Sequence, residues 1–122
     1  MAEIRKSKQL EKRTNEFAHR AVKLALALEG TKLGNHIAGQ LIRCATSVAA
    51  NYRACNLAQS KASFKSKLSI VLEETDECLF WIEFAVDEKL VGGNKVKDII
   101  AETGQLKAIF YSSRKTLSLG KK

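Results

Sequence analysis

The residues of this 122-residue chain that could carry out chemistry are few and scattered. Glu16 and His19 have the ExxH spacing found in di-iron helix bundles, but a di-iron centre needs two such pairs and two further glutamates on facing helices. The segment 34–56, which we predict to be one of those helices, contains no acidic residue. The sequence therefore predicts no di-iron centre.

The three cysteines, Cys44, Cys55 and Cys78, include no CxxC pair and have no nearby histidine that would complete a zinc site. A cysteine–histidine nucleophile pair would need His19 or His36 beside a thiol and an oxyanion motif, which the sequence lacks. We expect the cysteines to be small buried residues, with a redox or metal role as the alternative. No glycine-rich phosphate loop is present either. We predict no catalytic residue, no metal and no cofactor, and hence a protein that is not an enzyme.

A line of polar residues, Arg43, Ser47 and Asn51, repeats every four residues along one predicted helix. Antiparallel pairing with the helix that follows places Arg43 opposite Glu74 and Glu77. The cluster is either a ligand-binding or catalytic charge group, or a structural ion pair that fixes helix register. In the second case, Ser47 and Asn51 would bond across the two helices. We favour the structural interpretation.

Basic residues outnumber acidic ones, with 21 Lys and Arg against 13 Asp and Glu and a net charge of +8. The segment 61–90 is acidic, with seven acidic residues against four basic ones, and the rest of the chain is basic. This balance favours contact with a polyanion through its phosphates, although each basic residue taken singly also fits a solvated helix face. The candidate phosphate ligands are Lys6, Lys8, Lys12, Arg13, Arg20, Lys23, Arg53, Lys61, Lys65, Lys67, Lys107, Arg114 and Lys115.

The five phenylalanines fall mostly on predicted core lines, so they form no platform on which RNA bases could stack. We therefore expect recognition of RNA backbone or shape rather than of base sequence.

The elements that position these residues follow from composition and apolar spacing. Proline is absent and only seven glycines occur, which favours an all-α chain over a strand-rich one. Apolar residues at helical spacing predict four helices, at about 9–29, 34–56, 61–89 and 95–118, with Gly30 as a stop and Ser60 and Asn94 as N-caps. Short connections make adjacent helices antiparallel. The prediction is an up-down-up-down four-helix bundle with residues 1–122 in one domain.

The third predicted helix, 61–89, is apolar over more than one stripe. Its seam residues step by three and four, and Trp81 and Phe84 lie off that seam. Because one bundle does not need this surplus, Trp81 and Phe84 are candidates for an interface between subunits.

The sequence has no run of about 18 apolar residues, and its charged N-terminal stretch is not followed by a hydrophobic signal region. We expect no membrane contact and a cytoplasmic location.

Three segments carry a resemblance to a known family: Gln40–Arg53, Ser60–Leu68 and Glu73–Trp81. Together they closely resemble the four-helix bundle proteins named for the 23S ribosomal RNA intervening sequence, the S23-like family. The resemblance implies a ring-shaped homopentamer associated with RNA. A more distant likeness is to the accessory protein of diversity-generating retroelements, a basic pentamer that binds a reverse transcriptase and nucleic acid. The chain departs from the usual pattern at Ala54 and at 56–57, where charged residues are common.

Two functional hypotheses remain. The first is a non-enzymatic oligomeric protein that binds structured RNA or a ribonucleoprotein through basic helix faces. The second is a structural oligomeric adaptor for a protein partner, such as a reverse transcriptase, without direct RNA binding.

Overall fold

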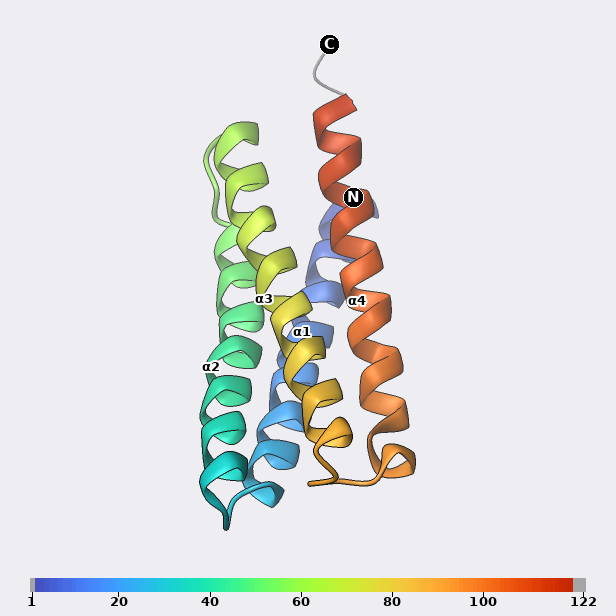
Figure 1. Ribbon diagram of the computed structural model, residues 1–122. Helices are drawn as coiled ribbons and strands as arrows, with labels where there is room; N and C mark the ends of the chain where they lie inside the picture. The colour runs from blue at the N-terminus through green and yellow to red at the C-terminus, as the bar shows by residue number, and fades with distance from the viewer. Residues whose placement is uncertain (1, 120–122) are drawn as a thin grey trace.

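The computed structural model describes residues 2–119, with side chains described for 5–118. They form four helices, α1 (Ala2–Ala27), α2 (Lys32–Cys55), α3 (Lys61–Asp87) and α4 (Gly93–Leu119) (Figure 1). Each helix packs against the next one along the chain, and α4 closes the bundle with a sparser contact to α1. The all-α prediction of an up-down-up-down four-helix bundle is confirmed.

Capping groups set several of the helix ends. The Ser60 side chain accepts a hydrogen bond from the Ser63 amide at 3.1 Å, so it is the N-cap of α3 that the sequence predicts. Thr31 caps α2 in the same way through the Gly34 amide at 3.0 Å. Gly30, in the connection between α1 and α2, has a φ of +126°, a conformation that favours glycine. These caps explain why the connections are short.

Three of the four helices begin earlier than expected, and α2 begins at Lys32 rather than at residue 34. Helix α1 begins at Ala2 rather than near residue 9. Its first turns lack apolar periodicity, but they are rich in Lys, Arg, Glu and Gln, which are good helix formers. Helix α4 begins at Gly93, so Asn94 lies inside its first turn, and the Lys95 amide bonds to the Gly92 carbonyl at 3.0 Å.

The core lies along the bundle axis, where the predicted apolar stripes of the four helices meet. Its largest fully buried side chains include Phe17, Ile37, Leu41 and Phe110. Cys44, Cys55 and Cys78 are buried, as the sequence predicts.

Among the described residues, every buried polar side-chain atom has a hydrogen-bond partner. None of the helices in this part of the chain has both the length and the apolar character needed to cross a membrane.

Candidate nucleic-acid interface

Alternating helix directions bring the start of α1, the turn between α2 and α3, and the end of α4 to one end of the bundle (Figure 1). The stretches 5–13, 44–72 and 103–118 contain twelve Lys and Arg residues and one acidic residue, Glu11. We call the surface of these three stretches the basic end. Residues that are far apart in the sequence therefore share one strongly positive surface.

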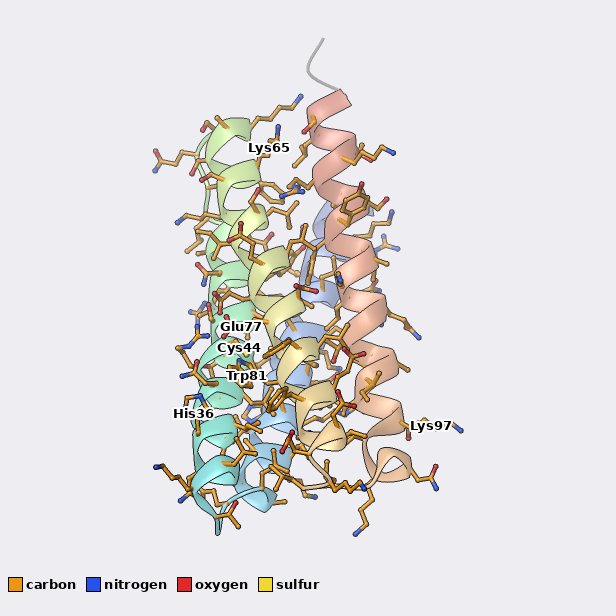
Figure 2. The ribbon with its side chains drawn as sticks, in the orientation of Figure 1. His36, Cys44, Lys65, Glu77, Trp81 and Lys97 are labelled. Atoms are coloured by element: carbon orange, nitrogen blue, oxygen red, sulfur yellow. The ribbon has the colours of Figure 1, made fainter. Side chains whose placement is uncertain are left out.

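The predicted phosphate ligands divide between this end and the rest of the bundle. Figure 2 shows Lys65 at the basic end and Lys97 at the opposite end. Arg20 and Lys23 lie apart, lining a groove of about 470 Å³ between α1 and α4 together with Lys95. The basic end gathers the others: Lys6, Lys8, Lys12, Arg13, Arg53, Lys61, Lys65, Lys67, Lys107, Arg114 and Lys115.

Three of these basic side chains are engaged in contacts between helices. Arg13 makes two hydrogen bonds of 2.7 Å to the Glu102 carboxylate, which joins α1 to α4 and raises the pKa of Arg13. The Lys107 ammonium pairs with Asp76 of α3 at 2.7 Å. Arg114 donates to the Ser69 hydroxyl at 3.4 Å. A phosphate would have to compete with these partners.

The other basic side chains at this end are free to meet a phosphate. Among the residues that the structure describes, none of them has a carboxylate within ion-pair distance: Lys6, Lys8, Lys12, Arg53, Lys61, Lys65, Lys67 and Lys115. They come from α1, α2, α3 and α4, so the free positive charge runs across the end of the bundle rather than along one helix.

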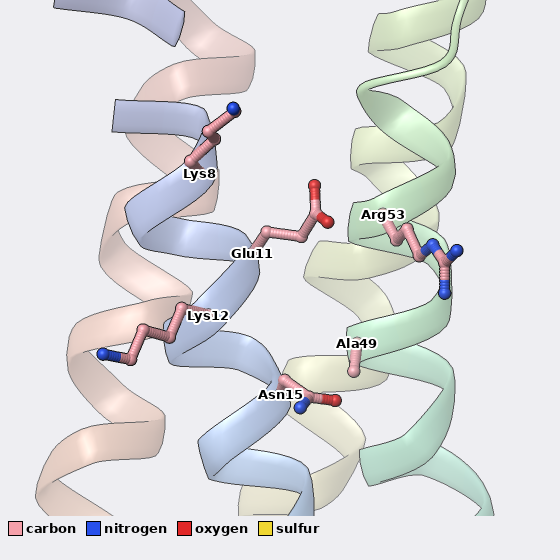
Figure 3. Close-up of a pocket in the computed structure, with 6 residues that line it drawn as sticks. All are labelled: Lys8, Glu11, Lys12, Asn15, Ala49 and Arg53. Atoms are coloured by element: carbon pink, nitrogen blue, oxygen red, sulfur yellow. The ribbon is translucent and has the colours of Figure 1, made fainter. Parts of the chain in front are cut away.

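A groove of about 440 Å³ lies between α1 and α2 at the basic end. Figure 3 shows Glu11 extending from α1 toward α2, while Lys12 and Arg53 extend away from the groove on either side. The Glu11 carboxylate accepts a hydrogen bond of 2.8 Å from the Asn56 side chain. An acidic floor with basic rims is unsuited to holding one anion inside, but it suits a polyanion that lies across the rims.

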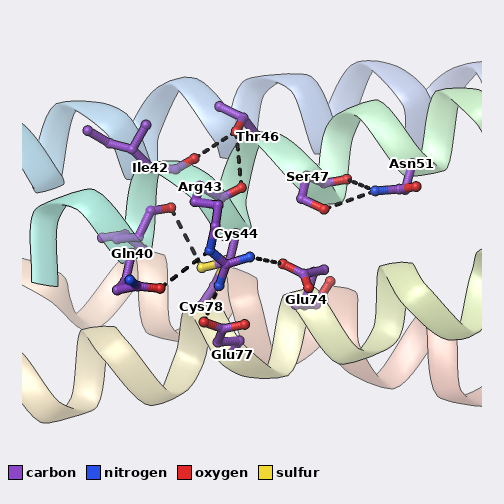
Figure 4. Close-up of polar contacts among 12 residues, drawn as sticks. Gln40, Ile42, Arg43, Cys44, Thr46, Ser47, Asn51, Glu74, Glu77 and Cys78 are labelled. Atoms are coloured by element: carbon purple, nitrogen blue, oxygen red, sulfur yellow. Dashed lines mark hydrogen bonds and ion pairs between the residues drawn. The ribbon is translucent and has the colours of Figure 1, made fainter.

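The predicted contact of Arg43 with Glu74 and Glu77 is present between α2 and α3 (Figure 4). Arg43 bonds to Glu74 at 3.0 Å, and Glu77 accepts bonds from both Arg43 and the Trp81 indole N–H, the latter at 3.0 Å. The Arg43 bonds raise its own pKa. They also lower the pKa of Glu77, with the Trp81 bond as a second cause. The site is a ladder of charge-assisted bonds on the surface of the α2–α3 pair.

The expected bonding of Ser47 and Asn51 across the helices is wrong. The Asn51 amide donates to the Ser47 carbonyl at 3.0 Å and to the Ser47 hydroxyl at 2.9 Å, both within α2. A side chain four residues further along a helix reaches its own helix more easily than the neighbouring one. Only the Arg43 part of the polar line therefore joins two helices.

Replacing Arg43 with alanine is expected to lower the melting temperature by a few degrees, about 2–5 °C. The Arg43 side chain is 49% exposed, and an exposed ion pair contributes at most about 1 kcal/mol to stability. Thermal unfolding followed by circular dichroism measures the shift. Arg53→Ala is the matched control, because Arg53 is exposed on the same helix and has no carboxylate partner among the described residues. Equal melting temperatures for the two variants would contradict a structural role for the Arg43 ladder.

The ladder also predicts how stability depends on pH. Because folding lowers the pKa of Glu77 below its usual 4.5, the ionised carboxylate stabilises the fold above about pH 4.5. That contribution is lost as the pH falls through 4.5 toward the folded pKa. Between about pH 5 and 3, the melting temperature of the unchanged protein should fall more steeply than that of Glu77→Gln. Parallel curves for the two proteins would show that Glu77 is not stabilised by its partners.

An aromatic cluster lies beside the ladder on α3. Phe80 is 52% exposed and contacts Trp81 edge-on at a ring distance of 4.9 Å and stacks on Phe84 at 5.7 Å. His36 of α2 meets Trp81 at 5.5 Å. Trp81 and Phe84, the predicted interface residues, are half-buried, whereas Phe80, expected near the core, is the most exposed. Phe80 and Trp81 lie three and four residues after Glu77, so helical spacing alone does not tell which of the two is exposed.

A solved structure and a family profile both match this chain, in agreement with its fold and with the segments that resemble the family. The chain matches a crystal structure of a protein of unknown function from the S23 ribosomal protein family of Bacteroides thetaiotaomicron, with a TM-score of 0.83 and 29% identity. The match covers 91% of this chain and 99% of that one. No curated protein was found to match. The profile of the 23S rRNA-intervening sequence proteins matches residues 6–112, and the chain therefore belongs to the 23S rRNA-intervening sequence protein family.

Proposed function

We propose that this protein binds structured RNA, with ribosomal RNA as the first candidate, through the phosphates that meet its basic end. The observation that carries the proposal is the gathering at this end of eight basic side chains that have no carboxylate within ion-pair distance among the described residues. Family membership supports ribosomal RNA in particular, because the family is named for an intervening sequence of 23S rRNA.

The mode of binding follows from the shape of this surface. The free cations come from all four helices and flank an open groove rather than a closed pocket. Such a surface fits the phosphates of a folded RNA and offers no set of groups aimed at base edges. We propose that the protein acts by binding, without catalysis, and in the cytoplasm, where ribosomal RNA is located.

The test is a titration of the purified protein into labelled 23S rRNA fragments and into an unrelated RNA duplex of equal length. If about four phosphates are neutralised, the affinity for both should fall roughly 100-fold between 50 and 200 mM salt. Preference for the rRNA fragment at the higher salt would support shape recognition. Absence of binding at 50 mM salt would overturn the proposal.

The aromatic face of α3 favours a second role, the assembly of several copies. The helix contains six acidic and three basic residues, whereas α1, α2 and α4 are each net basic. A second copy of the chain therefore offers the opposite charge to the acidic residues around Phe80. We propose a homo-oligomer that uses Phe80, Trp81 and Phe84, with five copies implied by the resemblance described above.

Assembly would repeat the basic end with the symmetry of the oligomer and strengthen RNA binding by avidity. Light scattering on a sizing column measures the mass, and a value near 13.5 kDa would reject the oligomer. Phe80→Ser should lower the mass, while Tyr111→Ser, at a residue 54% exposed on α4, should not. An oligomer that fails to bind RNA would instead favour the adaptor for a protein partner, such as a reverse transcriptase.

A further inference from the structure

Two of the three cysteines lie against each other between α2 and α3. The sulfur atoms of Cys44 and Cys78 are 3.2 Å apart, and both side chains are completely buried. A disulfide has an S–S distance of about 2.05 Å, so bond formation requires a relative movement of only about 1 Å. Cys55 lies eleven residues from Cys44 on the same helix, about 16 Å away, and is out of reach of Cys44.

We propose that Cys44 and Cys78 are an oxidation site, at which a small hydroperoxide converts the two thiols into a disulfide that joins α2 to α3. Nothing in this proposal depends on RNA binding or on assembly. The disulfide would close a ring of residues 44–78, which contains the turn between α2 and α3. It would therefore fix the register of α2 against α3 covalently.

The chemistry balances with one peroxide per disulfide. The Cys44 sulfur, deprotonated during a transient opening, attacks one peroxide oxygen, the O–O bond breaks, and the released hydroxide takes up a proton to leave as water. Cys44 is then a sulfenic acid. The Cys78 sulfur displaces its hydroxyl group, and a second water molecule leaves. Two thiols have lost two electrons, and hydrogen peroxide has been reduced to two water molecules.

The order of these steps follows from the contacts of the two thiols. Cys78 donates its hydrogen to the Cys44 sulfur, and this bond, together with burial, raises the pKa of Cys78. We assign the first attack to Cys44 because its sulfur is the acceptor of this hydrogen bond and Cys78 is the donor. Burial also raises the pKa of Cys55, to about 11, and no second thiol faces it across the helices. Cys55 is thus a control thiol within the same chain.

Access to the pair is controlled by the Arg43 ladder. Figure 4 shows Arg43, Glu74 and Glu77 beside Cys44 and Cys78, at the junction of α2 and α3. Peroxide reaches the thiols only when these two helices separate locally, and the ladder opposes that separation. Removing Arg43 should therefore speed the reaction severalfold without changing its product.

The experiment exposes the reduced full-length protein to hydrogen peroxide, blocks remaining thiols with N-ethylmaleimide under denaturing conditions, and measures the mass. The expected result is a loss of two of the three thiols, restored by dithiothreitol, with a peptide map that joins Cys44 to Cys78. The melting temperature of the oxidised protein should rise by roughly 10 °C, because the bond restricts the unfolded chain.

Matched variants decide the assignment. Cys55→Ala should form the bond as the unchanged protein does, and Cys44→Ala and Cys78→Ala should each fail to form it. Circular dichroism would show whether Cys44→Ala or Cys78→Ala fails to fold. Because either variant alone tests the bond, a folding defect in one of them leaves the other as the test. Three alkylatable thiols after oxidation, a bond that includes Cys55, or a disulfide between two chains would each overturn the proposal.

Discussion

Replacing Arg53, Lys61 and Lys65 together with glutamate is expected to weaken the binding of structured RNA at least about 100-fold at 50 mM salt. These residues lie at the basic end and have no carboxylate partner among the described residues. The change removes three attractive charges and adds three repulsive ones where the RNA backbone would lie. Fluorescence anisotropy with a labelled rRNA fragment measures the affinity.

The matched control replaces Lys32, Lys95 and Lys97 with glutamate; these exposed residues lie at the starts of α2 and α4, at the opposite end of the bundle. Both triple variants lower the net charge of +8 by the same amount, so they differ only in where the charge is changed. The control should lose affinity by less than about tenfold, through long-range electrostatics alone. An equal loss in both variants would show that net charge, and not the basic end, governs binding.

Replacing Phe110 with alanine is expected to destabilise the fold by about 3–5 kcal/mol and to lower the melting temperature by roughly 10–20 °C. The Phe110 ring is completely buried and packs on Tyr52 at a ring distance of 5.7 Å. Its removal leaves a cavity where α4 joins the core. Helix α4 depends on such contacts because its packing against α1 is sparse.

Tyr111→Ala is the control for this change, since Tyr111 is the next residue on α4 and is 54% exposed. Urea unfolding followed by circular dichroism gives the free energy of unfolding for both variants. The Tyr111 variant should differ from the unchanged protein by less than about 0.5 kcal/mol. A loss of less than 1 kcal/mol for Phe110→Ala would mean that α4 does not rely on this residue for its place in the bundle.

The fold could be predicted from the sequence because each helix carries a local signal. Val48 and Tyr52 of α2 and Leu68 and Cys78 of α3 are buried as their spacing requires. This is so because helical periodicity depends only on neighbouring residues. The Ser60 cap is a local signal of the same kind. Apolar periodicity does not predict the start of α1, because the charged residues there favour a helix without carrying an apolar period.

The candidate site could be predicted only in part. The basic residue types indicate phosphate binding, but from the sequence Arg13 and Lys12 are equally good candidates for a phosphate ligand. In the structure, Arg13 is bonded to Glu102, which lies 89 residues away, while Lys12 is exposed and has no such partner within the described part of the chain. Similarly, Phe80 and Phe84 belong to the same helix, and only the packing of the whole bundle decides that Phe80 is the more exposed.

The sequence alone determined four helices, their antiparallel order, the core lines and the facing of Arg43 and Glu74, because these depend on local spacing and on short connections. It also determined the family, through the resemblance of its motifs to those of known members. The tertiary structure decided which described basic side chains have a carboxylate partner, that eight of those without one share one end of the bundle, and that Cys44 touches Cys78. The physical reason is that ion pairs and thiol contacts act over a few ångströms between residues far apart in the chain. Only the packed bundle fixes those distances.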